Sequence, residues 1–355
     1  MNTETFATEV PTRWVGPLRV SGDAVARGLS HTEVSVPLAT YETPLWPSVG
    51  RGASISREIE GGIRTTVVDE RMTRSVLFVT EAAVVANHGA GVIAERFAEL
   101  QQVVSAGSKH ARLIEAHPEV VGNLLFIRFA FKTGDASGHN MVTNASDALM
   151  QRILSWNIGL SYGSISGNFC SDKKATAVNG ILGRGRNVVA EILLPHEVVH
   201  RRLRTTSREL TDLVIRKNLV GSTIAGALRS SNAHYANMLL AFYMATGQDA
   251  ANIVEGSQGI TYAEDREEGL YFSCTLPHLI VGTVGNGKHL SQIDDALEKL
   301  GCRENREPGE NSSRLAALIA ATVLCGEQSL LAAQTNPGEL MATQLLMERK
   351  EQPGK

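Results

Sequence analysis

The sequence predicts a protein of the α+β or α/β class with two domains. Its 355 residues exceed the roughly 100–200 residues of one typical domain, and 43% of them are hydrophobic, which is enough for a sizeable core. In residues 76–164, stretches typical of strands alternate with stretches typical of helices. These observations predict a smaller domain with a strand–helix–strand–helix pattern within a larger protein.

The first expected strand covers residues 33–41, where the side chains begin to alternate at Val34. Glu42 follows this strand directly and precedes a rigid turn that contains Pro44 and Pro47. Side chains at the end of a strand can be held rigidly while they face a cleft. This segment alone therefore fits a functional carboxylate and an exposed loop glutamate equally well.

The smaller domain is expected to contain five elements in chain order. We expect a strand at residues 76–79, a long alanine-rich helix at 81–104, a strand at 124–131, a helix at 145–156 and a short strand at 159–166. The first four form one strand–helix–strand–helix unit. The last strand leads the chain toward a charged group that begins at Asp172.

Two further segments are apolar enough to be buried helices. Residues 231–248 are apolar around most of the helix circumference, although His234 and Asn237 lie on nearly one face. A buried amide without a partner costs about 1–3 kcal/mol, so a ligand or an internal hydrogen-bond network is expected there. Residues 315–325 are shorter than the roughly 18–20 residues that span a bilayer, and they also indicate a buried helix.

The composition argues against several classes of protein. The chain carries 34 Lys and Arg against 37 Asp and Glu, and this small net charge of -3 gives no reason to expect nucleic acid or a membrane surface as a partner. The first residues lack the basic and apolar regions of a secretory signal, so we expect a cytoplasmic protein. Because no CxxC pair occurs, we expect reduced thiols, and neither a zinc site nor disulfides, at Cys170, Cys274, Cys302 and Cys325.

One segment matches a short zinc-binding motif. His196, Glu197 and His200 fit the HExxH pattern, which on a helix would place two imidazoles on one face to bind zinc. Matches of five residues occur by chance, however, and the basic run at 201–204 would place cations beside a dication. We therefore interpret the segment as the polar start of a helix after Pro195, and we expect no metal.

Asp172, Lys173 and Lys174 form a dense charged group within a stretch that is otherwise nearly uncharged. The flanking residues, 164–171 and 175–186, are rich in Gly, Ser and Ala, so the backbone can approach a ligand closely. Two ammonium groups beside one carboxylate concentrate positive charge on a small target. The segment therefore indicates a local anion site, although an isolated group of this kind is usually a solvated turn.

Other segments accompany this charged group along the chain. In order, the set consists of residues 36–42, 133–141, 172–174, 247–251 and 281–287, with linking stretches at 216–221 and 231–237. Together these segments closely resemble the hydroxymethylglutaryl-CoA (HMG-CoA) reductase family, from about residue 14 to residue 349. Agreement over nearly the whole chain is far more specific than any single short motif.

The resemblance implies both a fold and a reaction. The fold would have a large substrate-binding domain of residues 1–75 and 165–330, an inserted ferredoxin-like nicotinamide-binding domain of residues 76–164, and a C-terminal flap of residues 331–355. The reaction would be the NADPH-dependent, four-electron reduction of the HMG-CoA thioester to mevalonate and CoA. Eukaryotic members of the family carry a membrane anchor, so we expect a soluble protein of the prokaryotic type.

The reduction of a thioester to an alcohol takes two hydrides, and each addition develops negative charge on the carbonyl oxygen. The resemblance places Lys173 at this oxygen, Glu42 as the proton donor and Asp249 as the carboxylate that tunes both. A carboxyl group that shares a site with a second carboxylate has a raised pKa, so Glu42 is expected to be protonated near neutral pH. Arg74 and Lys174 are the cations expected to bind the terminal carboxylate of the substrate.

The resemblance also implies binding residues. Contacts with the hydroxyacyl group and CoA are expected from Ser48, Arg51, Arg74, Ser166, Asp172, Lys174, Lys217, His234 and Asn237. Contacts with the nicotinamide nucleotide are expected from Arg96, Asp135, Ser137, Gly138, Asn140, Met141, Gly285, Gly287 and Arg349. The guanidinium groups of Arg96 and Arg349 favour a 2′-phosphate, and hence NADPH over NADH, although Glu95 weakens this preference.

The chain departs from the family pattern at three positions. Ser137 and His139 stand where methionines are common, and Gln344 stands where the family has a catalytic histidine on its flap. Glutamine cannot give up a proton at neutral pH, so the activity is expected to be impaired. A reductase of a different acyl-CoA thioester and a weakly active CoA-binding relative remain as alternatives. The resemblance further implies a homodimer, or a dimer of dimers, with the active site between subunits.

Overall fold

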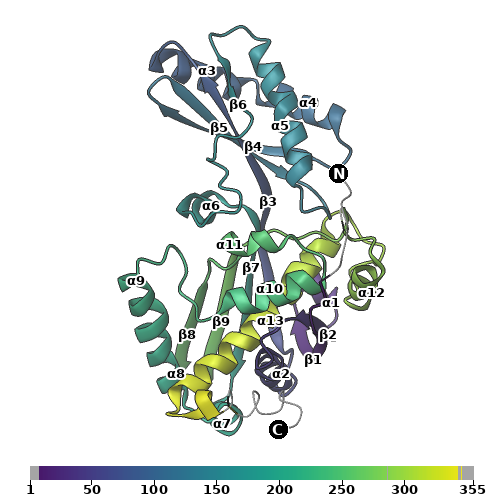
Figure 1. Ribbon diagram of the computed structural model, residues 1–355, viewed down its shortest axis with the longest axis vertical. Helices are drawn as coiled ribbons and strands as arrows, with labels where there is room; N and C mark the ends of the chain where they lie inside the picture. The colour runs from purple at the N-terminus through teal and green to yellow at the C-terminus, as the bar shows by residue number, and fades with distance from the viewer. Residues whose placement is uncertain (1–7, 286, 343–344, 346–355) are drawn as a thin grey trace.

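The computed structural model describes residues 8–285, 287–342 and 345, which form two lobes that share one long strand. Strand β3 (Ile63–Val79) runs from the larger lobe into the smaller lobe (Figure 1). Its first half pairs with β7 (Gly185–Leu194), and its second half pairs with β5 (Leu124–Lys132). The sheets of the two lobes are therefore joined through β3.

The larger lobe is built on a sheet with the strand order β2-β1-β3-β7-β9-β8. Neighbouring strands are antiparallel except for β1 and β3, which meet in parallel at Val20 and Ile63. In β7, alternate side chains such as Val188 and Ala190 are buried in the core. The other strands of this sheet are β1 (Thr12–Ser21), β2 (Thr32–Ala39), β8 (Ile260–Arg266) and β9 (Gly269–Leu279).

Helix α13 (Glu310–Thr335) forms the centre of the larger lobe. It packs against α2 (Leu45–Ser56), α10 (Tyr235–Ala245), β7 and β9. A Cβ atom added at Gly52 of α2 would lie only 2.5 Å from the backbone of Cys325, so only glycine allows this close approach. By length and composition α13 could span a membrane, but 94% of its most apolar window is buried inside the protein. Core packing therefore accounts for its hydropathy.

Shorter helices complete the larger lobe. Among them, α8 begins with a capping box in which the side chains of Thr206 and Glu209 accept each other's backbone N–H. These helices are α1 (Asp23–Ala26), α6 (Ala177–Leu182), α7 (His196–Val198), η1 (Val199–Leu203), α8 (Ser207–Leu213), η2 (Val214–Gly221), α9 (Ser222–Ile224), η3 (Ala250–Asn252), α11 (Ile253–Gly256) and α12 (Ser291–Lys299).

The smaller lobe has the βαββαβ order of a ferredoxin-like domain. After β3 it continues through α3 (Ala83–Glu95), α4 (Phe97–Gly107), β4 (Arg112–Val121), β5, α5 (His139–Leu154) and β6 (Ser161–Ser164). Its strands lie in the order β4-β5-β3-β6, and all of the neighbours are antiparallel. The predicted α+β fold with a ferredoxin-like part is therefore confirmed.

Most of the predicted elements are present with shifted ends. The strands predicted at 33–41, 124–131 and 159–166 are β2, β5 and β6; the helices predicted at 145–156, 231–248 and 315–325 are α5, α10 and the centre of α13. The prediction of one helix at 81–104 is wrong, because α3 and α4 meet at Arg96, which has φ −95° and ψ 20°. Since neither glycine nor proline stands at this break, no local signal predicts it.

The strand predicted at 76–79 is only the end of β3. Its earlier part, from Ile63, contains several charged residues and lacks an apolar run. Pairing with β1 and β7 of the larger sheet stabilises this part. The domain boundary that we predicted between residues 75 and 76 divides this strand, so this boundary and those after residues 164 and 330 stay predictions.

A buried arginine links the lobes where β3 passes between them. Arg186 on β7 donates one hydrogen bond to Oε1 of Glu70 and another to the carbonyl of Gly134, both at 2.9 Å. It also donates to the carbonyl of Val281 at 3.0 Å. Burial lowers the pKa of Arg186, and Glu70 opposes this effect. The loop at Gly134 is thereby fixed to the larger sheet.

Candidate active site

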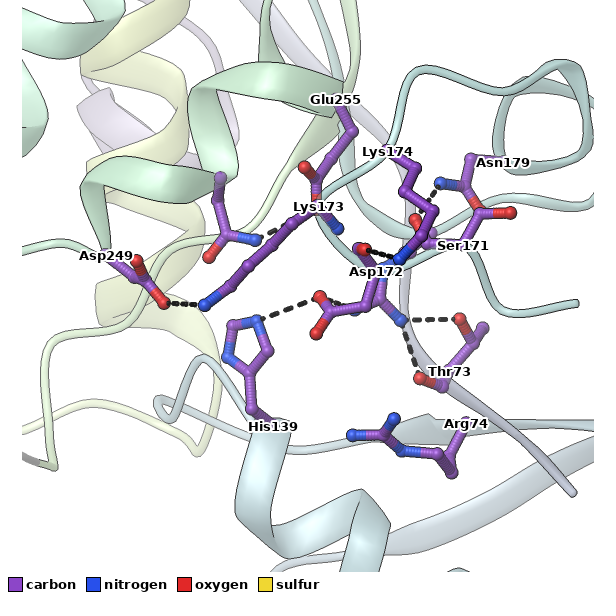
Figure 2. Close-up of polar contacts among 12 residues, drawn as sticks. Thr73, Arg74, His139, Ser171, Asp172, Lys173, Lys174, Asn179, Asp249 and Glu255 are labelled. Atoms are coloured by element: carbon purple, nitrogen blue, oxygen red, sulfur yellow. Dashed lines mark hydrogen bonds and ion pairs between the residues drawn. The ribbon is translucent and has the colours of Figure 1, made fainter. Parts of the chain in front are cut away.

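Lys173 and Asp249 form the centre of a polar cluster between the lobes (Figure 2). The Lys173 Nζ atom lies 2.6 Å from Oδ2 of Asp249. Hydrogen bonding to Asp249 raises the pKa of Lys173. Partial burial acts to raise the pKa of Asp249, but Lys173 and the N–H of Ala251 outweigh it and lower this pKa. At neutral pH the pair is therefore an ammonium beside a carboxylate.

The segment around Asp249 is fixed by local hydrogen bonds. Asp249 precedes η3, and its Oδ1 accepts a hydrogen bond from the N–H of Ala251 at 3.1 Å, as a helix cap does. Oε1 of Gln248 accepts from the N–H of Gly282 at 2.9 Å. Two segments that the sequence singled out separately, at 247–251 and 281–287, are therefore joined.

Asp172 connects the charged loop to both lobes. Its Oδ1 accepts a hydrogen bond from Arg184 at 2.5 Å and lies 3.4 Å from Nε2 of His139, the first residue of α5. Arg184 is buried and also donates to the carbonyl and hydroxyl of Thr73 on β3, at 2.6 and 2.8 Å. Burial acts to raise the pKa of Asp172, but His139 and Arg184 outweigh it and hold this pKa well below its usual range. Asp172 is therefore an ionised anchor for the loop.

Arg74 on β3 reaches the same cluster. It donates to the hydroxyl of Ser166 at 3.5 Å and to the hydroxyl of Thr143 in α5 at 2.7 Å. The exposed Lys174 donates from Nζ to the carbonyl of Asp172 at 3.1 Å. The structure thus places six predicted site residues around one position: Arg74, Ser166, Asp172, Lys173, Lys174 and Asp249.

The two predicted nicotinamide segments, residues 133–141 and 281–287, also lie against each other. The carbonyl of Asp135 accepts from the N–H of Thr283 at 2.8 Å, and its carboxylate accepts from the N–H of Ser312 at 2.9 Å. Gly138 has φ 91° just before α5, and a Cβ atom there would lie 2.7 Å from the side chain of Thr133. The loop therefore requires glycine at this position.

Apart from Arg96 and Arg349, the remaining predicted nucleotide contacts lie within these two segments. Ser137 precedes Gly138, while Asn140 and Met141 lie in the first turn of α5. Gly285 and Gly287 have φ 107° and 80°, conformations that glycine adopts without strain. The Arg96 guanidinium lies 4.9 Å from the ring centroid of Trp156. Arg349 is outside the described residues.

Several predicted site residues lie outside the Lys173 cluster. Glu42 is exposed just beyond β2, and no hydrogen bond or ion pair within the described part of the chain joins it to Lys173 or Asp249. The predicted sharing of a site by Glu42 and Asp249 stays a prediction. Ser48 and Arg51 lie on α2, where Arg51 pairs with Glu339 at 3.3 Å. Gln344 is outside the described residues.

Two more predicted residues, Lys217 and His234, are near a buried carboxylate on α13. Glu327 accepts from the N–H of Ala233 at 3.0 Å, from the N–H of His234 at 2.6 Å, and from the hydroxyl of Thr261 at 2.8 Å. Burial lowers the pKa of Lys217, and Glu327 opposes this effect. Nε2 of His234 is buried and has no hydrogen-bond partner among the described residues. The hydrogen bonds to Glu327 therefore satisfy the backbone N–H groups just before α10, but Nε2 of His234 remains without a partner among the described residues. Asn237 follows in the first turn of α10.

Glu255 is an important residue that the sequence did not single out. It is fully buried in α11, and its Oε1 accepts from the backbone N–H of Lys173 at 3.2 Å and from Nδ2 of Asn252 at 2.9 Å. Lys173 has a φ of 54°, which is unusual for a side chain of its size. Residues 249–256 thus hold Lys173 at both ends, through Asp249 at the ammonium and through Glu255 at the backbone.

The HExxH segment does not form one regular helix. α7 ends at Val198 and continues as the π-helical η1, so the imidazoles of His196 and His200 do not share a regular α-helical face. Nδ1 of His196 lies 2.8 Å from the hydroxyl of Ser207, and His200 is exposed. Across residues 8–285, 287–342 and 345, no group of three or more His, Cys, Asp or Glu could hold a metal ion. The absence of a metal stays a prediction. The four cysteines are buried and unpaired.

We expect Glu255→Gln to change how stability depends on pH. Burial raises the pKa of Glu255 above the ordinary value of 4.5. The contribution of Glu255 to the free energy of unfolding is therefore fully present below pH 4.5 and is lost as the pH rises through the raised pKa. Each unit of difference between the pKa values in the folded and unfolded states corresponds to about 1.4 kcal/mol. Glutamine keeps an acceptor for Lys173 but has no charge to desolvate, so the variant should lose less stability above this pH.

Urea unfolding at a series of pH values would measure this difference. The exposed Glu267 supplies a matched control, because Glu267→Gln removes one carboxylate without changing buried charge. Parallel stability curves for the wild type and Glu255→Gln would show that Glu255 is not perturbed by burial.

Comparison with known proteins agrees with this arrangement. The sequence profile of the hydroxymethylglutaryl-coenzyme A reductase family matches residues 4–342. The 3-hydroxy-3-methylglutaryl-coenzyme A reductase of Aeropyrum pernix is 44% identical over 329 residues, which cover 92% of this chain and 76% of that protein. The protein of the same name from Pyrococcus abyssi is 44% identical over 328 residues, with 92% and 79% covered.

Solved structures share the fold. The 3-hydroxy-3-methylglutaryl-coenzyme A reductase of Streptococcus pneumoniae has a TM-score of 0.69 at 19% identity, over 93% of this chain and 86% of that chain. A class II reductase from the same organism, bound to NADPH in open conformations, has a TM-score of 0.72 at 18% identity, over 95% and 78%. Because the family profile and the archaeal relatives extend over almost the whole sequence, the chain belongs to the hydroxymethylglutaryl-coenzyme A reductase family.

Proposed function

We propose that the chain is an NADPH-dependent HMG-CoA reductase that converts the thioester of (S)-HMG-CoA to (R)-mevalonate and CoA. The observation that carries this proposal is the Lys173 ammonium, which Asp249 holds at 2.6 Å and Glu255 anchors through the backbone. A cation in a fixed position suits a reaction in which negative charge develops on a carbonyl oxygen. The names of the archaeal relatives support the same assignment. A cytoplasmic location is part of the proposal.

Each residue of the cluster has its own role in this reaction. Lys173 stabilises the oxygen that becomes negative, and Asp249 keeps the ammonium charged and directed. Arg74 and Lys174 bind the terminal carboxylate of the substrate, with Ser166 beside them. Glu42 donates the proton that the final alkoxide requires. Two NADPH molecules, bound one after the other, would each supply one hydride.

We further propose that the nucleotide binds where residues 133–141 meet residues 281–287. The glycines with positive φ in both segments leave room for close approach of a ligand to the backbone. Arg96 is available on the smaller lobe to pair with a 2′-phosphate, which favours NADPH over NADH. The NADPH-bound class II reductase of similar fold supports this choice.

A second copy of the chain is proposed to complete the active site, in a homodimer or a dimer of dimers. Within the described part of one chain, Glu42 is exposed and makes no hydrogen bond or ion pair with Lys173 or Asp249. Nε2 of His234 is buried and has no hydrogen-bond partner among the described residues, as expected for a group that binds a ligand or a partner subunit. HMG-CoA and a second subunit are therefore the proposed partners.

The departures from the family pattern are compatible with a second activity. Ser137 and His139 change the border of the nucleotide site, and a reductase of a different acyl-CoA thioester is the second hypothesis that fits this change. A weakly active relative that only binds CoA is a third reading. The pairing of Lys173 with Asp249 argues against that reading, because CoA binding alone does not need a cation directed at a carbonyl.

The decisive test is spectrophotometric measurement of NADPH oxidation with HMG-CoA, with other acyl-CoA thioesters and without substrate. We expect HMG-CoA to support turnover. Lys173→Ala should lower it by at least about 10²–10³-fold, the effect of removing one oxyanion donor, with little loss of CoA affinity. Lys109→Ala, which changes an exposed lysine of the smaller lobe, is the matched control. Unchanged turnover of Lys173→Ala, or a preference for another acyl-CoA, would contradict the proposal.

Mixing of variants tests the second copy. We expect Glu42→Gln and Lys173→Ala each to be nearly inactive, and their mixture to regain activity after subunit exchange. A hybrid dimer would contain one site in which Lys173 of one subunit meets Glu42 of the other. Light scattering would report the oligomeric state. A fully active monomer, or a mixture that stays inactive although hybrids form, would argue against a shared site.

We also expect Gln344→His to raise the turnover of HMG-CoA and to leave the reduction of mevaldehyde nearly unchanged. Only the thioester step releases a thiolate, so a further general acid at this position would speed that step alone. The measurement compares kcat for the two substrates in both proteins. Equal gains for both, or no gain for HMG-CoA, would show that a histidine at this position does not transfer a proton to the thiolate.

A further inference from the structure

A second ionisable pair, His139 and Asp172, lies beside the pair of Lys173 and Asp249. Nε2 of His139 is 3.4 Å from Oδ1 of Asp172, and the two side chains are only 19% and 25% exposed. Figure 2 shows the imidazole ring next to the Lys173 ammonium, with one nitrogen toward Asp172 and the other turned away from it. The ring is therefore next to the position at which the carbonyl of a substrate would react.

Both members of this pair are held in place. Asp172 is fixed by Arg184, which is anchored in turn on Thr73 of β3. His139 begins α5, and its carbonyl accepts a hydrogen bond from the hydroxyl of Thr143 at 2.8 Å. Thr143 also receives the hydrogen bond from Arg74. The imidazole is therefore positioned by the same strand that positions the charged loop.

Asp172 also determines where the ring carries its proton. Nε2 has no hydrogen-bond partner among the described residues, but the nearby carboxylate of Asp172 can only accept, so a proton on Nε2 is favoured and Nδ1 remains for exchange with a ligand. Aspartate and histidine work in this way in other enzymes, where the carboxylate orients the ring and the second nitrogen transfers the proton.

We propose that His139 is the catalytic acid of the thioester step, an inference that rests on the proposed reductase function. After hydride addition, the carbon–sulfur bond breaks, its electron pair leaves with sulfur, and the carbonyl reforms as an aldehyde. The His139 imidazolium gives its Nδ1 proton to the departing thiolate, which becomes the CoA thiol. The neutral imidazole regains a proton from water before the next turnover.

Other histidines near the cluster fit this role less well. His278 is fully buried, and burial lowers its pKa to about 4, so it is neutral and inaccessible at neutral pH. His234 is fixed at the start of α10 by the carboxylate of Glu327. Neither has an ion-pair contact with a member of the Lys173 cluster in the described part of the chain, whereas His139 has one.

The test compares the two half-reactions in His139→Gln. Glutamine has an amide that can donate a hydrogen bond toward Asp172 but cannot transfer a proton, so it separates positioning from acid catalysis. We expect turnover of HMG-CoA to fall by about 10²-fold or more, and turnover of mevaldehyde to change little. His88→Gln, an exposed histidine on α3 of the same lobe, is the matched control. Thermal unfolding and mevaldehyde turnover confirm that the variant is folded.

The double variant His139→Gln/Gln344→His gives the sharpest result. If His139 supplies the proton, a second acid at position 344 should restore HMG-CoA turnover toward that of Gln344→His alone. Equal losses for both substrates in His139→Gln, without rescue, would make His139 a positioning residue and overturn the proposal. Unchanged turnover of HMG-CoA in His139→Gln would overturn it as well. A wild type that reduces neither compound would instead contradict the reductase function, and this proposal with it.

Discussion

Strand β3 is the constraint on which the rest of the structure depends, because it is a member of both sheets. Residues 64–71 pair with β7, and residues 72–79 pair with β5. Arg74 projects into the polar cluster from this strand, and Thr73 binds the guanidinium of Arg184. The charged loop at residues 172–174 therefore has a fixed place relative to both lobes, even though it has no regular secondary structure of its own.

Two short segments then hold the Lys173 ammonium in a fixed position within this framework. Residues 249–256 hold Lys173 by its ammonium and its backbone, and Asp172 is tied to Arg184 from the other side. An ammonium on a flexible stem would lose conformational entropy on binding a ligand, whereas a side chain that is already held loses less. The same contacts keep the pKa of Lys173 raised, so the group stays charged at the pH at which it works.

The sequence predicted those features that depend on local patterns. Apolar segments predicted the buried helices α10 and α13, and short motifs indicated Lys173 and Asp249, which the structure joins. The length of β3 could not be predicted, because pairing with distant strands stabilises its charged first half. Glu255 was missed for a similar reason: its role depends on contact with a backbone N–H 82 residues away, and a lone glutamate gives no signal of this contact.

Charge at the junction of the lobes differs sharply from the net charge of -3 of the whole chain. Arg184 and Arg128 are both fully buried there, and burial, together with repulsion from Arg184, lowers the pKa of Arg128 to about 10. Backbone carbonyls accept several of their hydrogen bonds, but Asp172, Asp249 and the buried Glu255 only partly balance the cations that include Arg74, Lys173 and Lys174. An incompletely balanced cluster costs stability in the free protein. A bound carboxylate or phosphate would relieve this repulsion, so the charges that destabilise the free protein are the same ones that favour an anionic ligand.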